Sequence, residues 1–129
     1  MAVPSGGGTE VLYRASMSIS NSDVWHYLGG EGFSGASGTT IRTIDAHKII
    51  TILNFNVTET GNANVGFSCD ARDEANSLTP RICRPDLPAY GTFVYNDKII
   101  MHYQDYIRFA PVPAATMTVT VNYIIQDWN

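Results

Sequence analysis

Hydrophobic and polar residues alternate with a period of two in four segments of the chain, and this alternation is the strongest structural signal in the sequence. Apolar residues alternate with Arg and Ser over residues 11–19, and with Thr and Asn over residues 116–123. Residues 49–57 and 63–69 alternate similarly, and Thr58–Gly61 between them has the length and chemistry of a hairpin loop. We expect these four segments to be half-buried antiparallel strands.

Weaker strand signals complete the pattern. They lie at residues 24–28, 40–44, 91–95, 98–103 and 106–109. About eight strands at spacings near ten residues, with turn residues between them, predict an all-β, single-domain antiparallel β-sandwich of the jelly-roll type. In the segment 49–57, the side chains expected on the buried face are Ile49, Leu53, Phe55 and Val57.

The composition also favours strands over helices. Val, Ile and Thr account for 33 of the 129 residues, whereas Glu, Lys and Gln, which usually coat exposed helices, account for 8. Charged residues make up 16% of the chain, against roughly 25% in typical soluble domains. We therefore expect outward faces that are built of Thr, Ser and Asn and are close to neutral.

The charge pattern limits the classes of partner. The net charge is −4 and the eight Lys and Arg residues are scattered, whereas phosphate binding needs clustered cations. No apolar stretch approaches the roughly 18 residues of a membrane span, and the first residues lack the regions of a signal peptide. We therefore expect no nucleic-acid or membrane partner, and we expect the protein to be made and first folded in a cytoplasm. Residues 1–8 should form a flexible arm, and residues 9–129 a β-sandwich domain.

Two segments resist assignment to strands, and loops of their length are usually functional or ordered by a partner. Residues 20–39 combine three aromatic residues with five Gly, and residues 70–90 carry three Pro and most of the local charge. Trp25, Tyr27 and Phe33 could form a platform for sugar rings, whereas the alternation of Trp25 and Tyr27 also fits a strand that packs in the core. The candidates for an interaction surface are Trp25, Tyr27, Phe33, Arg81, Arg84 and Asp86.

Motifs for catalysis and cofactor binding match only in part. Gly30–Gly35 has the spelling G-x-G-x-x-G, but no helix follows it, so it predicts a flexible loop rather than a dinucleotide site. His26, His47 and His102 are isolated in sequence, and Asp45 near His47 has no second ligand pair at metal spacing. We expect a non-enzymatic protein with no cofactor, metal or catalytic residue, and a small hydrolase stays an alternative.

Cys69 and Cys83 enclose 13 residues, and a bond between them would close the second long loop. In the chain-entropy model such a bond contributes roughly 3 kcal/mol. A chain without an export signal more often keeps its cysteines reduced. The sequence leaves both states open.

A series of features between residues 40 and 126 resembles a known family. A strand ends in Asn54-Phe-Asn56, and a Gly hairpin, a Leu87-Pro loop, the Gln104-Asp105 turn and a final Val/Tyr strand at residues 117–124 follow. This order resembles the small β-sandwich proteins of tailed-bacteriophage virions, which include capsid decoration proteins and head or tail attachment proteins. Gln104 stands where such domains often have Gly, so we expect a less tight turn there.

The resemblance implies a non-enzymatic structural protein of a phage virion, specifically a capsid decoration (cement) protein that binds the capsid surface as an oligomer. The implied partners are the major capsid protein or another virion protein, together with further copies of this chain in a trimer. The implied location is the virion, assembled in the host cytoplasm. A receptor- or carbohydrate-binding attachment module of a head fibre or tail would use the same fold and stays the alternative.

Overall fold

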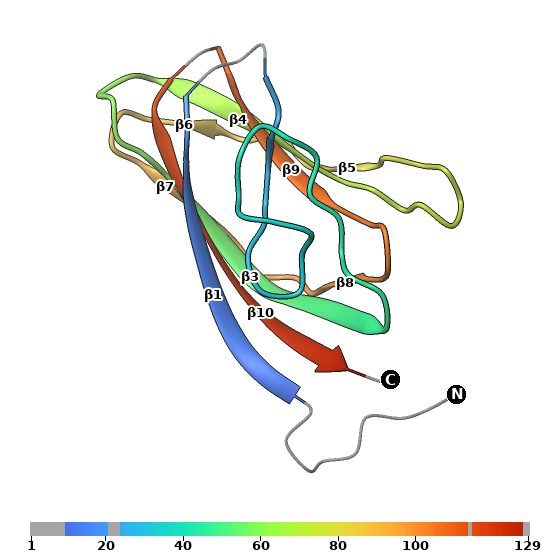
Figure 1. Ribbon diagram of the computed structural model, residues 1–129. Coiled ribbons are helices and arrows are strands. Elements are labelled where there is room, and N and C mark those ends of the chain that lie inside the picture. The colour runs from blue at the N-terminus through green and yellow to red at the C-terminus, as the bar shows by residue number, and fades with distance from the viewer. Residues whose placement is uncertain (1–9, 21–23, 114, 128–129) are drawn as a thin grey trace.

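The computed structural model describes residues 10–20, 24–113 and 115–127, which form two packed antiparallel sheets (Figure 1). The arm predicted for residues 1–8 lies outside the described residues. No helix occurs within the described ranges, and thus none that could span a membrane. The strands are β1 (Glu10–Ile19), β2 (His26–Tyr27), β3 (Lys48–Glu59), β4 (Val65–Ala71), β5 (Arg81–Cys83), β6 (Asp86–Leu87), β7 (Thr92–Tyr95), β8 (Ile99–Met101), β9 (Ile107–Val112) and β10 (Met117–Asp127).

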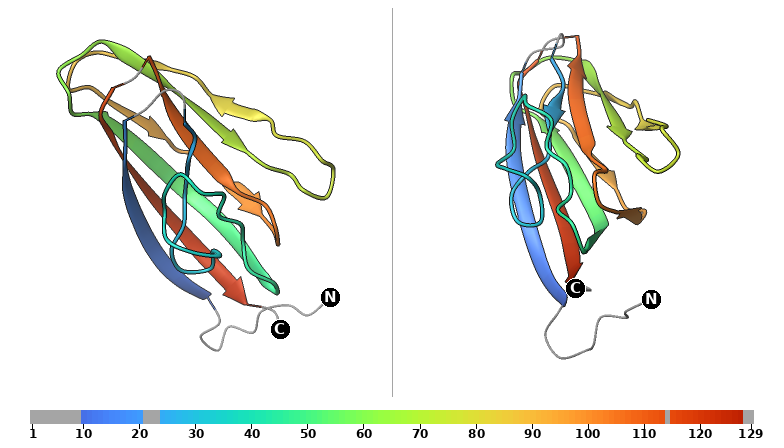
Figure 2. Two further views of the ribbon diagram at one scale, coloured as in Figure 1. Left: turned by 45° about the horizontal axis from the view of Figure 1, so that its top comes forward. Right: turned by 45° about the vertical axis from the view of Figure 1, so that its right-hand side comes forward.

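The strand order is that of a jelly roll. Sheet A has the order β1-β10-β3-β7, and β8 pairs with another part of β3. Sheet B has the order β2-β9-β4-β5, and β6 pairs with another part of β4. When β5 and β6 are counted as one broken strand, and β7 and β8 as another, each sheet has four strands, as in a double-sheet jelly roll. Figure 2 shows the two layers from two further directions. The predicted all-β sandwich of about eight strands is confirmed.

Aromatic rings from the two sheets meet in the core. Phe55 of β3 stacks on Tyr95 of β7 with ring centroids 4.9 Å apart, and it meets Phe109 of β9 edge-on at 5.2 Å. The ring centroid of Phe109 in turn lies 6.4 Å from that of Phe67 of β4. Such aromatic pairs contribute about 0.5–1.5 kcal/mol beyond the burial of their area. The contact of Phe55 with Phe109 therefore links sheet A directly to sheet B.

β3 departs from the predicted alternation at a bulge. The sequence predicts Ile49 and Leu53 on the buried face, but Ile50 and Ile52 are the fully buried residues, and Ile49 and Leu53 are only partly covered. The register between β3 and β10 shifts at this point, so that Leu53 is an extra residue. One extra residue exchanges the inward and outward faces in one half of a strand. The predicted core is therefore wrong in this half of β3, where Ile50 and Ile52 take the buried positions expected for Ile49 and Leu53.

Two further expectations are wrong. The strand expected at residues 40–44 is absent. The only strand-type pairing in that segment is an isolated bridge between Phe33 and Ile44. Conversely, the long loop at residues 70–90 contains β5 and β6. Pro85 separates them because it has no N–H to donate, although its carbonyl accepts a bond from the backbone N–H of Phe67 at 3.2 Å.

Candidate interaction surfaces

The outward face of sheet A is built mainly of short, neutral polar side chains from four neighbouring strands. Alternation turns the even-numbered residues of β1 and β10 outward, and the register aligns them with outward residues of β3 and β7. We call this surface the ladder face. Its three central cross-strand rows are Arg14, Asn122 and Asn54; Ser16, Thr120, Asn56 and Val94; and Ser18, Thr118, Thr58 and Thr92.

Hydroxyl groups within these rows bond to one another across strands. The hydroxyl oxygens of Ser16 and Thr120 are 3.1 Å apart, and those of Thr58 and Thr92 are 2.9 Å apart. Cross-strand pairs of this kind contribute roughly 0.2–1 kcal/mol each. Because a hydroxyl has one donor and two acceptor sites, each still has hydrogen-bonding capacity for water or a partner.

The ladder face carries little charge. Arg14 is the one charged side chain in the three central rows of this face. Arg14 Nε donates to Asn122 Oδ1 at 3.1 Å, and Asn122 Nδ2 donates to Asn54 Oδ1 at 2.8 Å. Lys48 and Asp127 form an ion pair at the far end of β3 and β10, where Nζ and Oδ2 are 2.9 Å apart. The hydrogen bond to Asp127 raises the pKa of Lys48 above its ordinary value. The central rows therefore present a nearly neutral surface.

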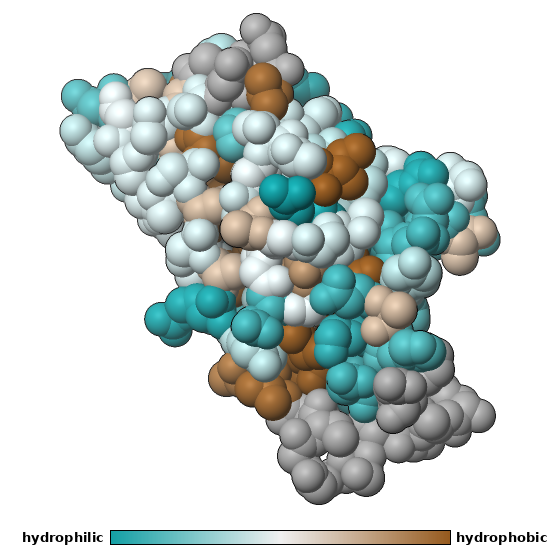
Figure 3. All heavy atoms as spheres, in the orientation of Figure 1, coloured by the Kyte–Doolittle hydropathy of each residue, from teal (hydrophilic) through white to brown (hydrophobic). Residues whose placement is uncertain are grey.

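One end of the ladder face is apolar. The register continues the rows with Leu12, Ile124, Thr51 and Ile100. Leu12 is 66% exposed and Ile100 is 63% exposed. Figure 3 shows an apolar patch at the lower end of β1, next to a pale surface of weakly polar residues. Exposed apolar patches of this kind often mark contact sites.

The outward face of sheet B carries a buried carboxylate between two arginines. The register aligns Tyr27, Arg108, Asp70 and Arg81 in one row across β2, β9, β4 and β5, which we call the arginine row. Arg81 Nε donates to Asp70 Oδ1 at 3.2 Å and Arg108 Nη2 donates to Asp70 Oδ2 at 3.1 Å, while the Asp70 side chain is 7% exposed. The guanidinium of Arg108 lies 4.0 Å from the ring centroid of Trp25. The charges of this row are thus bound mainly to each other.

The arginine row contains two of the six predicted interaction residues, Tyr27 and Arg81, and a third, Trp25, lies against Arg108 of that row. Tyr27 is buried, however, and so is Phe33, which meets Tyr123 edge-on with ring centroids 5.9 Å apart. These two rings pack within this chain rather than lying open at its surface. The remaining candidates, both exposed, are Arg84 and Asp86. Contact of a partner with the four accessible candidates stays a prediction.

Sequence patterns did not identify Asp70 and Arg108 as members of one site. The two residues are 38 positions apart and share no motif. Asp70 follows the alternation of residues 63–69 and so belongs to the outward side of its strand. Only the pairing of β4 with β9, which no local pattern encodes, brings Arg108 beside it.

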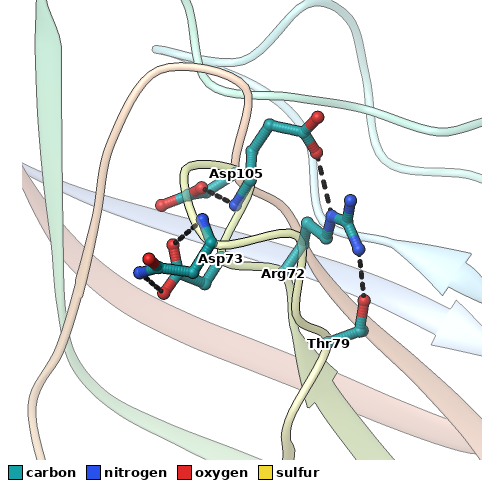
Figure 4. Close-up of polar contacts among 6 residues, drawn as sticks. Arg72, Asp73, Thr79 and Asp105 are labelled. Carbon is teal, nitrogen blue, oxygen red and sulfur yellow. Dashed lines mark hydrogen bonds and ion pairs between the residues drawn. The ribbon is translucent and has the colours of Figure 1, made fainter.

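The loop between β4 and β5 is held by side-chain bonds (Figure 4). Arg72 Nε donates to Glu74 Oε2 at 2.9 Å, and Arg72 Nη1 donates to Thr79 Oγ1 at 3.1 Å. The bond to the Glu74 carboxylate raises the pKa of Arg72 above its ordinary value. The backbone N–H of Glu74 donates to Asp105 Oδ1 at 2.9 Å, and this bond ties the loop to the turn between β8 and β9.

Asp105 also closes that turn. Its Oδ2 accepts a bond from the backbone N–H of His102 at 2.8 Å, and its own N–H donates to the His102 carbonyl at 3.0 Å. Gln104 has a φ of 71°, in the left-handed region that Gly occupies most easily. The expectation of a looser turn is therefore wrong, because Gln104 adopts the tight conformation and Asp105 secures it.

A groove of about 410 Å³ lies between this loop and β8. Ile82, Ile99 and Met101 supply apolar lining, and Arg72 and Asp105 are among its polar residues. Because the polar groups of Arg72 and Asp105 are bonded within the chain, the groove offers mainly apolar contact to a ligand.

The described histidines occupy different environments. His26 is buried, and burial lowers its pKa below the ordinary 6.5, whereas His47 and His102 are exposed. Across the described ranges, no three His, Cys, Asp or Glu side chains are grouped so that they could hold a metal ion.

Comparisons with known proteins identify a shared fold. No family model and no curated protein matches the sequence. Among solved structures, the chain is similar to a protein in the structure of infectious bursal disease virus, Gx strain, with a TM-score of 0.54, 10% identity and coverage of 93% of this chain. It spans about a third (33%) of that viral chain.

Two further solved structures have similar folds. A subunit of the disulfide-linked pili known as Bacillus endospore appendages has a TM-score of 0.50 and 7% identity, with coverage of 100% of this chain and 98% of that one. The Drosophila NLP core, described with pentamer formation and histone binding, has a TM-score of 0.49 and 7% identity, with coverage of 86% and 96%. At 10% and 7% identity, the similarities to the viral protein and the pilus subunit show a shared fold alone.

Proposed function

We propose that this chain is a non-enzymatic structural protein of a bacteriophage virion, which decorates the capsid surface as a homo-oligomer. A trimer is the favoured state, the major capsid protein or another virion protein is the partner, and the virion is the location. The proposal is supported by the virion-protein resemblance of residues 40–126 and by the nature of the ladder face.

The ladder face is the observation that carries the proposal. Two of its three central rows run across four strands and the other across three, and together they contain one charged side chain. Burial of a neutral hydroxyl or amide in an interface costs little when it finds a hydrogen-bond partner, whereas burial of an unpaired charge costs far more. The cross-strand bonds also order the side chains in advance, which lowers the entropy lost on association. A nearly neutral surface with side chains ordered in advance suits attachment to a protein lattice.

The shared fold is compatible with this role. Jelly-roll domains occur in viral capsid proteins as well as in lectins. A viral protein and a pilus subunit are among the chains with similar folds. Fold similarity at 10% identity or below does not carry function across, so it supports the proposal only as a compatible architecture.

Binding to undecorated capsids of the source phage tests the proposal. We expect the purified protein to sediment with these capsids up to a saturating ratio, and to have an oligomeric mass in solution. Failure to sediment, together with a monomeric mass, would overturn the proposal. Capsids already saturated with the protein serve as the control for non-specific adhesion.

The second candidate function is a carbohydrate- or receptor-binding attachment module. The groove beside the β4–β5 loop favours it, because its apolar lining can accept a ring or side chain, and Trp25 offers part of an aromatic surface on sheet B. Glycan-array binding that is lost in Trp25→Ala would support this function. Absence of binding to every glycan would count against it.

A further inference from the structure

The structure places the two cysteines directly opposite each other. Cys69 of β4 and Cys83 of β5 are register partners in an antiparallel pair. Partners in such a pair have Cα atoms about 4.5–5.5 Å apart. A disulfide needs a Cα separation of about 4.4–6.8 Å. The backbone therefore already holds these residues at a separation that a disulfide can span.

The two thiols differ in environment, although they are in hydrogen-bond contact with each other. Cys69 is fully buried and Cys83 is half-buried, and both are free thiols. Burial raises the pKa of Cys69 well above its ordinary value. The hydrogen bond from Cys69 lowers the pKa of Cys83, so Cys83 is the thiol that ionises and reacts first.

We propose that Cys69 and Cys83 are the site of a reversible intrachain disulfide, which forms when the protein meets a small-molecule disulfide such as oxidised glutathione. This inference does not depend on the proposed function. The sequence alone left the state of the two cysteines open, and the pairing of β4 with β5 supplies the missing geometry.

The chemical step is a thiol–disulfide exchange in two stages. The Cys83 thiolate attacks one sulfur of oxidised glutathione, forms a mixed disulfide and releases one glutathione thiolate. Cys69 then loses its proton and attacks the Cys83 sulfur, which releases the second glutathione thiolate. The protein loses two electrons and two protons, and one molecule of oxidised glutathione becomes two molecules of glutathione.

The disulfide would lock the loop that borders the groove. It encloses the 13 residues 70–82, which include Arg72, Glu74 and Thr79 of the bonded network. Closure of a loop of this length reduces the freedom of the unfolded chain, and we expect a rise in the melting temperature of roughly 10 °C. The oxidised protein therefore holds β5 and its loop more firmly against β4.

Equilibration of the protein with mixtures of reduced and oxidised glutathione tests the proposal. We expect the free thiols, counted after denaturation, to fall from two to none, and the chain to become lighter by two hydrogen atoms. Peptide mapping should join the peptides of Cys69 and Cys83, and a thiol reductant should reverse the melting-temperature rise.

Cys83→Ser and Cys69→Ala are matched controls that should keep the reduced melting behaviour in both buffers. If a variant fails to fold, the comparison of reduced with oxidised wild-type protein still tests the proposal. Three outcomes overturn the proposal: two free thiols after full equilibration, a stable glutathione adduct on Cys83 without closure, or disulfides only between chains on a non-reducing gel.

Discussion

The two outward faces of the sandwich use polar side chains in opposite ways. On the ladder face, neutral groups such as Ser16 and Thr120 bond across strands. On sheet B, the carboxylate of Asp70 is buried between the guanidiniums of Arg81 and Arg108. Loss of a neutral group removes one weak bond, whereas loss of the carboxylate leaves positive charge without its partner. The polar groups of the arginine row are therefore bound to one another, whereas the hydroxyls of the ladder face keep hydrogen-bonding capacity for water or a partner.

The largest effect is expected at Asp70. Asp70→Asn removes the charge that both arginines share, and because Arg81 is 46% exposed, the loss should be roughly 2 kcal/mol, less than for a pair buried on both sides. Urea denaturation at neutral pH measures the loss, and Asp86→Asn, an exposed change on the same sheet, should stay within about 0.5 kcal/mol. Equal small effects of the two substitutions would show that the arginine row does not stabilise sheet B.

Neighbouring residues at the end of β3 give a second contrast, because Glu59 points inward and Thr58 points outward. The Glu59 carboxylate accepts backbone N–H bonds from Tyr90 at 2.9 Å, from Ala63 at 3.1 Å and from Gly61 at 2.7 Å. These bonds, that from Tyr90 foremost, lower the pKa of Glu59 below the ordinary 4.5.

The sign of this shift predicts a pH dependence. The folded state favours the charged carboxylate, so its stabilisation is present above pH 4.5 and is lost as the pH falls through the lowered folded pKa. Glu59→Gln should therefore destabilise the protein above pH 4.5, and its difference from wild type should shrink below that pH. Thr58→Val is the control without such a trend. A pH-independent difference for Glu59→Gln would contradict the prediction.

The smallest effects are expected within the ladder face. Ser16→Ala and Thr120→Val should each change the free energy of unfolding by no more than about 0.5 kcal/mol. A double-mutant cycle should give a coupling of roughly 0.2–1 kcal/mol for the hydroxyl pair. Coupling near zero would mean that the hydroxyls do not stabilise each other, and single losses above about 2 kcal/mol would place this face among the stabilising parts of the fold.

Sequence patterns predicted the parts of the fold that are governed by local alternation. The regular pattern of β1 and β10 predicted both strands and the face that each buries. The same reasoning failed in β3, because the extra residue Leu53 exchanges inward and outward faces. It also missed β5, a three-residue strand that is stabilised by pairing with β4 rather than by its own pattern.

Of the two candidate surfaces, only the ladder face was predictable from the sequence. The neutral polar character of the ladder face follows from its Thr, Ser and Asn residues. The arginine row was not predictable, since Asp70 and Arg108 meet only through long-range strand pairing. Phe33 looked accessible because it lies in a Gly-rich loop, yet that loop folds back and buries the ring against Tyr123.

The most direct test of the central claim compares capsid binding by two variants with the same chemical change. Ser16→Glu places a charge in the middle of the ladder face, and Ser77→Glu places one in the exposed β4–β5 loop. Burial of an unpaired carboxylate should weaken binding of Ser16→Glu by roughly 100-fold or more, whereas Ser77→Glu should bind like wild type. Equal affinity of Ser16→Glu and wild type, with both proteins folded, would contradict the assignment of the ladder face as the assembly surface.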